Sequence, residues 1–144
     1  MVGLPGVGKS SFFKNVFAPL GYHQSNRDTL GTQAKCLHAA RQALTAGHSV
    51  VVDNTNMTVD QRTPFVVLAK ACGASVRCIV LQTPIAVAQL LNSRREGSQC
   101  VPILVYRHML KTFEDPTLVE GFSSILVINN HLASAVRNGH IPPP

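Results

Sequence analysis

Gly3-Leu4-Pro5-Gly6-Val7-Gly8-Lys9-Ser10 matches the phosphate-loop pattern G-x-x-x-x-G-K-[ST] at every fixed position. The residues from Ser11 to Phe17 are compatible with a helix, until Pro19 interrupts it. In such a loop the glycines let backbone N–H groups turn inward around phosphate oxygens, and the helix N-terminus adds a positive dipole. The pattern predicts nucleotide binding; the alternative is a chance glycine-rich turn before a helix.

Individual residues of this loop have predicted roles. Lys9 is expected to reach the β- and γ-phosphates of ATP, and the Ser10 hydroxyl is expected to ligate Mg²⁺. The nucleotide contacts expected from the whole loop are Gly3, Pro5, Gly6, Gly8, Lys9, Ser10 and Ser11.

The residues before the loop are too few for an ordinary first strand. A phosphate loop normally follows a buried strand of about five residues, whereas here only Met1 and Val2 precede Gly3. We therefore expect the first strand to be largely missing. We favour the interpretation that this sequence is part of a longer chain; the alternative is a sheet that holds the loop less rigidly.

The rest of the chain alternates β-rich runs with segments long enough to hold helices, which predicts parallel strands joined by crossovers. The expected strands are Tyr22–Ser25, Val50–Val52, Val76–Leu81 and Ile125–Ile128. With 144 residues, of which 45% are hydrophobic, one globular core is expected. The predicted fold class is α/β, a P-loop NTPase-type parallel sheet with flanking helices. We expect one domain over residues 1–130 and a loose tail over residues 131–144.

Helical spacing of apolar residues predicts four helices after the first one. The expected ranges are 34–44, 65–72, 84–95 and 102–115. The second of these has two candidate starts, since Pro64 lies close to both. Thr58 with Gln61 would form a capping box, whereas Thr63 would cap a helix that has Pro64 in its first turn. We favour the later start.

Composition restricts the class of protein. Thirteen Lys and Arg residues against seven Asp and Glu residues give a formal net charge of +6. Because only seven residues are acidic, each carboxylate can be considered individually. The four cysteines show no disulfide framework or zinc-ligand spacing, which favours a reduced chain. The uncharged runs are too short to span a bilayer, and no secretion signal is visible. We expect an intracellular protein without membrane contact.

Two carboxylates are predicted to lie near the bound phosphates. Asp28 and Asp53 each follow an expected strand, and ligands of open α/β sheets bind outside the carboxyl ends of the strands. A kinase needs a carboxylate to accept the proton of the acceptor hydroxyl, and it often needs another on the metal side. Asp28 suits the first role and Asp53 the second. The alternatives are a helix N-cap for Asp28 and a turn residue for Asp53.

Several cations are candidates for contacts with phosphate groups. Arg94 and Arg95 end the helix that follows Pro84, where a mobile arginine could close on the transferred phosphoryl group. The alternative is a favourable interaction with the helix C-terminus. The other candidates, which could bind acceptor phosphates or be solvated surface charges, are Arg27, Lys35 and Arg62.

Four segments together resemble a known family. They are Gly3 to Ser10, Asn26-Arg27-Asp28-Thr29-Leu30-Gly31, Asp53-Asn54-Thr55-Asn56, and Pro116-Thr117-Leu118-Val119-Glu120-Gly121-Phe122. In this order they resemble the kinase domain of the eukaryotic bifunctional polynucleotide phosphatase/kinase of DNA repair, over nearly all of residues 1 to 130. The resemblance implies an enzyme, a polynucleotide 5′-hydroxyl-kinase that uses ATP and Mg²⁺.

The resemblance also implies roles for particular positions. Lys9 and Ser10 correspond to the ATP and Mg²⁺ contacts, Asp28 to the carboxylate that activates the 5′-hydroxyl, and Arg95 to a lid arginine. The catalytic set is then Lys9, Asp28 and Arg95, and the metal set is Ser10 and Asp53. The substrate-binding positions are Arg27, Lys35, Asp53 and Arg62. This sequence departs from the family at Pro64, where a second groove arginine is expected, and in a shorter segment from Glu96 to Phe113.

Partners and location follow from the same resemblance. The expected substrate is a DNA 5′-hydroxyl end, with RNA as an alternative, and the expected location is the nucleus, with mitochondria as an alternative. Family members carry an Asp-x-Asp-Gly-Thr phosphatase motif upstream of the kinase, and this sequence has none, so a phosphatase domain is expected upstream in the full-length protein. Two other functions stay open: a P-loop kinase of a small metabolite hydroxyl, and a non-catalytic nucleotide- or DNA-binding remnant.

Overall fold

The structure is a computed structural model that describes residues 1–95, 97 and 100–129. Strands and helices alternate along the chain, as the sequence predicts. The helices are α1 (Lys9–Phe12), α2 (Arg27–Leu30), α3 (Gln33–Thr45), α4 (Val59–Ala71), α5 (Ile85–Ser93) and α6 (Ile103–Lys111). The strands are β1 (His23–Ser25), β2 (Val50–Val52), β3 (Arg77–Gln82) and β4 (Ser124–Asn129). None of the described helices has the length and apolar character of a membrane span.

The strands are parallel and form two pairs on either side of the chain's first residues. β1 pairs with β2, and β3 pairs with β4. Residues 1–3 lie between the pairs: the N-terminal ammonium group of Met1 donates to the carbonyl of Val52 in β2, and the Val2 N–H donates to the carbonyl of Ile79 in β3. Val2 forms a single parallel bridge with Val80. The predicted fold class is confirmed, and the first strand is reduced to this one bridge.

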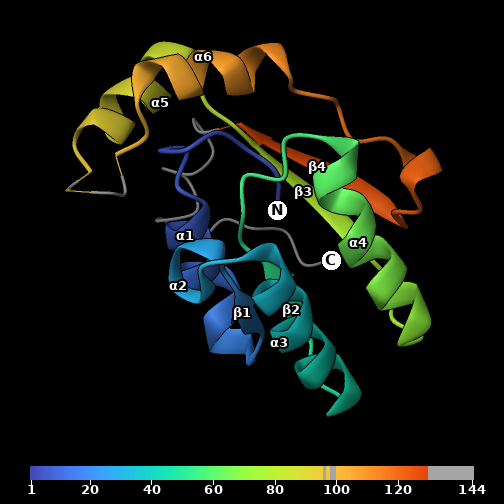
Figure 1. The fold of residues 1–144 in the computed structure, drawn as a ribbon. Coiled ribbons are helices and arrows are strands. Elements are labelled where there is room, and N and C mark those ends of the chain that lie inside the picture. Colours follow the sequence, from blue (N-terminus) through green and yellow to red (C-terminus); the bar gives the residue numbers. More distant parts are fainter. Residues whose placement is uncertain (96, 98–99, 130–144) are drawn as a thin grey trace.

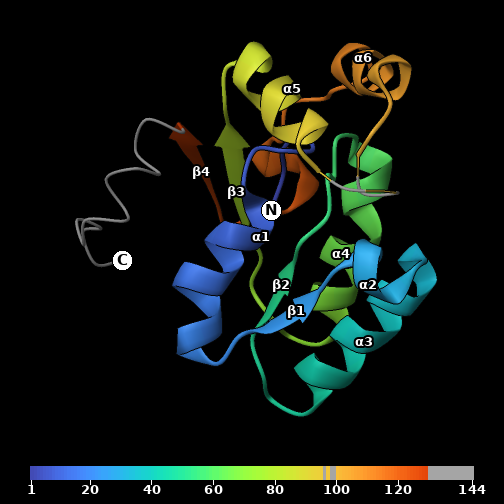
Figure 2. The ribbon, with the colours of Figure 1, turned by 90° about the vertical axis from the view of Figure 1, so that its left-hand side faces the viewer.

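The helices are arranged so that one end of the sheet is covered. α5 and α6 lie beyond the end toward which β3 and β4 point (Figures 1 and 2). α3 contacts β1 and β2 and packs against α4. Residue 2 runs parallel to β3, so the phosphate loop that follows it lies at the carboxyl end of β3. This is the end of the strands at which α/β sheets bind their ligands.

Two groups of buried apolar side chains hold these elements together. One joins β3 to α4 and to the segment after α6, and the other joins the phosphate loop to α5 and α6. The first consists of Val2, Val66, Cys78, Val80 and Phe122. The second consists of Val7, Leu81, Ala88 and Tyr106. The phosphate loop is therefore part of the core.

The segment after the phosphate loop is less regular than one α-helix. α1 continues as a π-helical segment, Phe13–Phe17, and then as a 3₁₀ turn, Ala18–Leu20. Pro19 lies within this turn and ends the helical run, as its missing N–H and fixed φ predict. The predicted loose tail over residues 131–144 lies outside the described residues.

The preferred start of α4 was wrong. The helix begins at Val59 and is capped by Thr58, whose side chain accepts a hydrogen bond from Gln61 N at 3.3 Å, and Pro64 lies inside it. The Gln61 side chain in turn accepts a hydrogen bond from Met57 N at 2.8 Å. These two bonds satisfy backbone N–H groups at the start of α4. Pro64 has no N–H group, so the helix lacks one internal hydrogen bond at that position.

This start can be tested with two matched threonine substitutions. We expect Thr58→Ala to lower the free energy of unfolding by about 1 kcal/mol, because it removes the N-cap. Thr63→Ala replaces an exposed threonine in the helix interior, so its effect should be near zero or slightly stabilising. Urea denaturation measures both. If Thr63→Ala were the costly substitution, the later start would hold.

Candidate nucleotide and acceptor site

The phosphate loop packs so tightly at Gly3 and Gly6 that neither position has room for a side chain. Gly6 has a φ of 87°, and a Cβ there would lie 2.5 Å from the Ala88 carbonyl oxygen of α5. A Cβ on Gly3 would lie 2.8 Å from the Leu81 carbonyl oxygen of β3. Both neighbours are backbone atoms, which cannot move aside as a flexible side chain can. The loop is therefore fixed between β3 and α5.

Lys9 bends back over this loop. Its Nζ donates to the carbonyl oxygens of Gly3 at 2.8 Å and Leu4 at 2.9 Å. Burial lowers the pKa of Lys9 from 10.5 to about 8, and nearby charges act on it as well. Asp53 and Asp28 raise this pKa, whereas Arg95 lowers it. The structure thus brings three of the predicted charged residues within electrostatic reach of Lys9.

Asp53 is the most densely bonded of the predicted site residues. It is only 3% exposed, and its Oδ2 accepts three hydrogen bonds. The donors are Ser10 Oγ at 2.8 Å, Gln24 Nε2 at 2.7 Å and Asn26 Nδ2 at 3.0 Å. Its Oδ1 is buried and has no hydrogen-bond partner among the described residues. The carboxylate is therefore held with one oxygen saturated and the other available.

This arrangement fits a hard cation such as Mg²⁺. A serine hydroxyl and a carboxylate oxygen lie together, and Mg²⁺ is commonly held by one or two such groups plus water and substrate phosphates. Within the described residues no cluster of three His, Cys, Asp or Glu side chains could hold a metal by itself. The donor set of Ser10 and Asp53 suits a metal that arrives with a nucleotide.

Asp28 is placed at the start of α2 but does not cap it. Asn26 is the N-cap, and its Oδ1 accepts a hydrogen bond from Asp28 N at 2.7 Å. The alternative that Asp28 is a plain N-cap is therefore wrong. Its side chain is exposed, and its charge acts on Lys9. The Arg27 N–H donates to Asn54 Oδ1 at 2.7 Å, which fixes α2 to the segment after β2.

Arg95 follows the end of α5, and its position depends on Asn92. The buried Asn92 amide donates to the Val101 carbonyl at 2.7 Å and accepts from Val101 N at 3.1 Å. These bonds close the base of the connector that carries Arg95. The Arg95 N–H donates to the Asn92 carbonyl at 3.1 Å. No sequence pattern indicates this role of Asn92, because its partner Val101 lies in an irregular segment.

The three basic residues predicted to bind substrate have different surroundings. Arg27 and Lys35 are exposed, in α2 and in the first turn of α3. Arg62 is only 3% exposed and forms an ion pair with Glu120 at 2.7 Å. Its hydrogen bonds hold the pKa of Glu120 below its usual value. The expectation that Arg62 lies in a substrate groove is corrected: its guanidinium is committed inside the protein.

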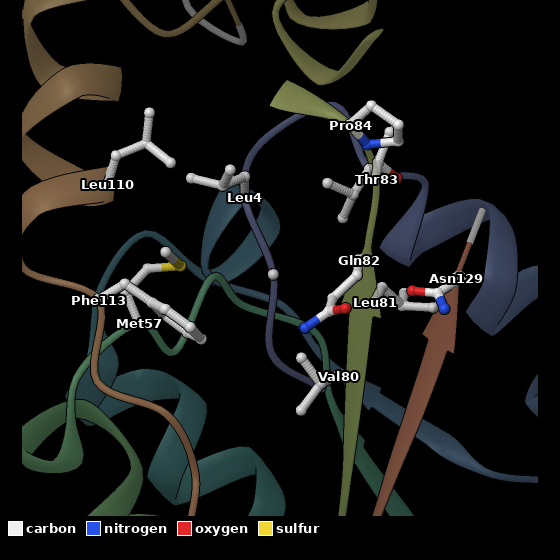
Figure 3. A pocket seen from close by; sticks show the side chains of 12 residues that line it. Leu4, Met57, Val80, Leu81, Gln82, Thr83, Pro84, Leu110, Phe113 and Asn129 are labelled. Atoms are coloured by element: carbon white, nitrogen blue, oxygen red, sulfur yellow. The ribbon is translucent and has the colours of Figure 1, made fainter. Parts of the chain in front are cut away.

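An apolar pocket of about 420 Å³ borders the phosphate loop (Figure 3). Leu4, Leu110 and Phe113 line it on one side, and Thr83 and Asn129 lie across from them. None of the predicted catalytic residues contributes to its lining. The pocket is therefore separate from the cluster around Lys9 and Asp53.

Comparison with known proteins adds family and fold. The AAA domain family matches residues 17–116, which is more than half of the chain. A protein of Acanthamoeba polyphaga mimivirus, assigned to the bifunctional polynucleotide phosphatase/kinases, is 41% identical over 131 residues. The bifunctional polynucleotide phosphatase/kinase of Schizosaccharomyces pombe is 34% identical over 128 residues. Each alignment covers 87% of this chain and 31% of the relative, so the chain spans about a third of their length.

A solved structure confirms the architecture. Kti12 of Chaetomium thermophilum, in complex with ADP-AlF3, superimposes with a TM-score of 0.71 and covers 98% of this chain and 97% of its own. At 14% sequence identity this similarity concerns the fold. This chain therefore shares with it the fold of a parallel α/β protein with a phosphate loop.

Lys9 makes nucleotide binding depend on pH. Because its pKa is lowered to about 8, the ammonium form is lost as the pH rises through this value. Phosphates favour the charged form, so we expect affinity for ATP to fall by about tenfold between pH 7 and pH 9. Calorimetric titration with ATP across this range measures the effect.

Lys9→Met is the control, since it should bind ATP weakly and without this pH dependence. A wild-type affinity that stays constant to pH 9.5 would contradict the role of the Lys9 ammonium.

Proposed function

The chain belongs to the AAA domain family and has the fold of a P-loop kinase, and from this premise we propose that it transfers the γ-phosphoryl group of ATP to the 5′-hydroxyl end of a polynucleotide. The observation that carries the proposal is the hydrogen-bonded link between the helix that bears the exposed Asp28 and the phosphate loop. Asp28 N donates to Asn26 Oδ1, and both Asn26 Nδ2 and Ser10 Oγ donate to Asp53 Oδ2. This link supports a site in which the proposed base and the nucleotide loop are held by one buried carboxylate. Sequence identity with two polynucleotide phosphatase/kinases supports the choice of acceptor.

The proposed reaction is an in-line displacement at the γ-phosphorus. Asp28 accepts the proton of the 5′-hydroxyl as its oxygen forms a bond to phosphorus, the bond to the β-phosphate oxygen breaks, and ADP leaves. Lys9 binds the β- and γ-phosphate oxygens, and Arg95 stabilises charge on the transferred group. Ser10 and Asp53 would hold Mg²⁺, which supplies positive charge at the phosphates when bound. Catalysis then rests on position and charge.

The polynucleotide acceptor is supported by charge. The formal net charge is +6, and Arg27 and Lys35 are exposed near the residue proposed as the base. The proposal includes DNA as the preferred acceptor, with RNA as the alternative, and strand-break repair in the nucleus, with mitochondria as the alternative. Since the chain spans 31% of the length of each relative, we also propose a phosphatase domain elsewhere in the longer protein.

The role of Asp28 can be separated from its place in a helix. We expect Asp28→Asn to lower kcat for transfer to a 5′-hydroxyl oligonucleotide by about 10²- to 10⁴-fold, because an amide cannot accept the proton. Affinity for ATP should change little. Asp60→Asn is the matched control, since Asp60 is also an exposed acidic residue in the first turn of a helix, α4.

Steady-state kinetics and ATP titration measure both variants. Equal losses of kcat in Asp28→Asn and Asp60→Asn would assign Asp28 to helix stability and overturn its role as the base.

Salt dependence identifies the class of acceptor. If Arg27 and Lys35 contact phosphates of a single strand, a fourfold increase in salt should raise the KM for an oligonucleotide by about sevenfold. Arg27→Gln should reduce this dependence, whereas Arg77→Gln should not. Arg77 is exposed at the opposite, amino end of β3. Transfer to a small neutral alcohol with no salt dependence would instead favour a small-metabolite kinase, and binding without turnover would favour a remnant.

A further inference from the structure

A buried ion pair lies outside the chemistry described so far. The Arg62 guanidinium donates to both carboxylate oxygens of Glu120, at 2.7 and 2.9 Å. Their side chains are 3% and 6% exposed. Glu120 Oε1 also accepts a hydrogen bond from Thr117 N at 3.0 Å, which holds the turn that contains Glu120. Buried pairs of this kind often add little net stability compared with apolar residues, so stability alone gives a poor account of this one.

The other side of the guanidinium holds a strained turn. Arg62 Nη1 donates to the carbonyl oxygen of Asn56 at 3.1 Å and to that of Glu114 at 2.9 Å. Asn56 is buried and has a φ of 49°, in the left-handed region that a non-glycine residue rarely adopts. Glu120 fixes the guanidinium, and the guanidinium fixes the carbonyl of this turn.

The turn at Asn56 also holds the start of the phosphate loop. Asn56 Nδ2 donates to the Met1 carbonyl at 2.7 Å, and the Gly3 N–H donates to the Thr55 carbonyl at 3.0 Å. The Gly3 carbonyl then accepts a hydrogen bond from Lys9 Nζ at 2.8 Å. A continuous chain of hydrogen bonds therefore runs from the ion pair to the ammonium group that binds phosphates.

We propose that Arg62, Glu120 and Asn56 are positioning residues, which aim the phosphate loop by fixing the turn at Asn56 against residues 1–3. Their contribution is to nucleotide affinity and transfer rate more than to folding. The transfer part of this inference rests on the proposed function, whereas the binding part requires only the phosphate loop.

Asn56→Gly removes the side chain that holds residues 1–3 and keeps the left-handed backbone of the turn. Glycine adopts the left-handed conformation freely, so the turn should survive and the melting temperature should stay within about 4 °C of wild type. The hydrogen bond to the Met1 carbonyl is lost. We expect affinity for ATP, measured by calorimetry, to fall by about tenfold, and the rate of transfer to an oligonucleotide to fall at least as much. Thr63→Ala, on the exposed side of α4, is the control and should keep both.

A second variant removes the ion pair and keeps its volume. Arg62→Met combined with Glu120→Leu should fold, because apolar replacement of buried pairs is commonly tolerated, and its ATP affinity should fall in the same way. Wild-type ATP affinity in folded Asn56→Gly would overturn the inference. The inference would also be overturned if, in both variants, the loss of ATP affinity were explained entirely by a lower melting temperature. If the wild-type protein transfers no phosphate to oligonucleotides, the proposed function is wrong. The ATP affinities of the variants still test whether Arg62, Glu120 and Asn56 position the phosphate loop.

Discussion

The hydrogen bonds made by four consecutive residues, 53 to 56, are the constraint on which the rest of the site depends. Asp53 gathers side chains from α1, β1 and the cap of α2. Asn54 binds the first N–H of α2, Thr55 binds the first glycine of the phosphate loop, and Asn56 binds the backbone before that loop. One short segment therefore sets the relative positions of the nucleotide loop and the helix that carries Asp28.

The carboxylates of Asp53 and Asp28 differ in environment, and this difference supports a different proposed role for each. Asp53 is buried, with three hydrogen bonds on one oxygen, which suits a fixed partner for a cation. Asp28 is exposed at the start of α2, where an acceptor hydroxyl can approach it. Lys9 lies within the field of both. The proposal therefore assigns the metal side to Asp53 and the proton of the acceptor hydroxyl to Asp28.

Local patterns were enough to predict much of the fold. The phosphate loop depends on eight adjacent residues, and strands such as Val50–Val52 are runs of β-branched residues that form where they were expected. The start of α4 was missed because the capping bonds of Thr58 outweigh the preference of proline for a first turn.

Contacts between residues far apart in sequence could not be predicted in the same way. Arg62 was placed in a substrate groove because charge alone does not show whether a residue is buried, and its partner Glu120 lies 58 positions away. Gln24 was missed as a partner of Asp53 because the register of β1 against β2 is set by tertiary packing.

Transfer of labelled γ-phosphate from ATP to two matched oligonucleotides shows whether the chain phosphorylates a 5′-hydroxyl end. The oligonucleotides have one sequence and differ only in carrying a 5′-hydroxyl or a 5′-phosphate. We expect label on the first and none on the second, with Mg²⁺ and the purified chain present. Equal labelling of both, or label on a small alcohol but on neither oligonucleotide, would contradict a 5′-hydroxyl acceptor.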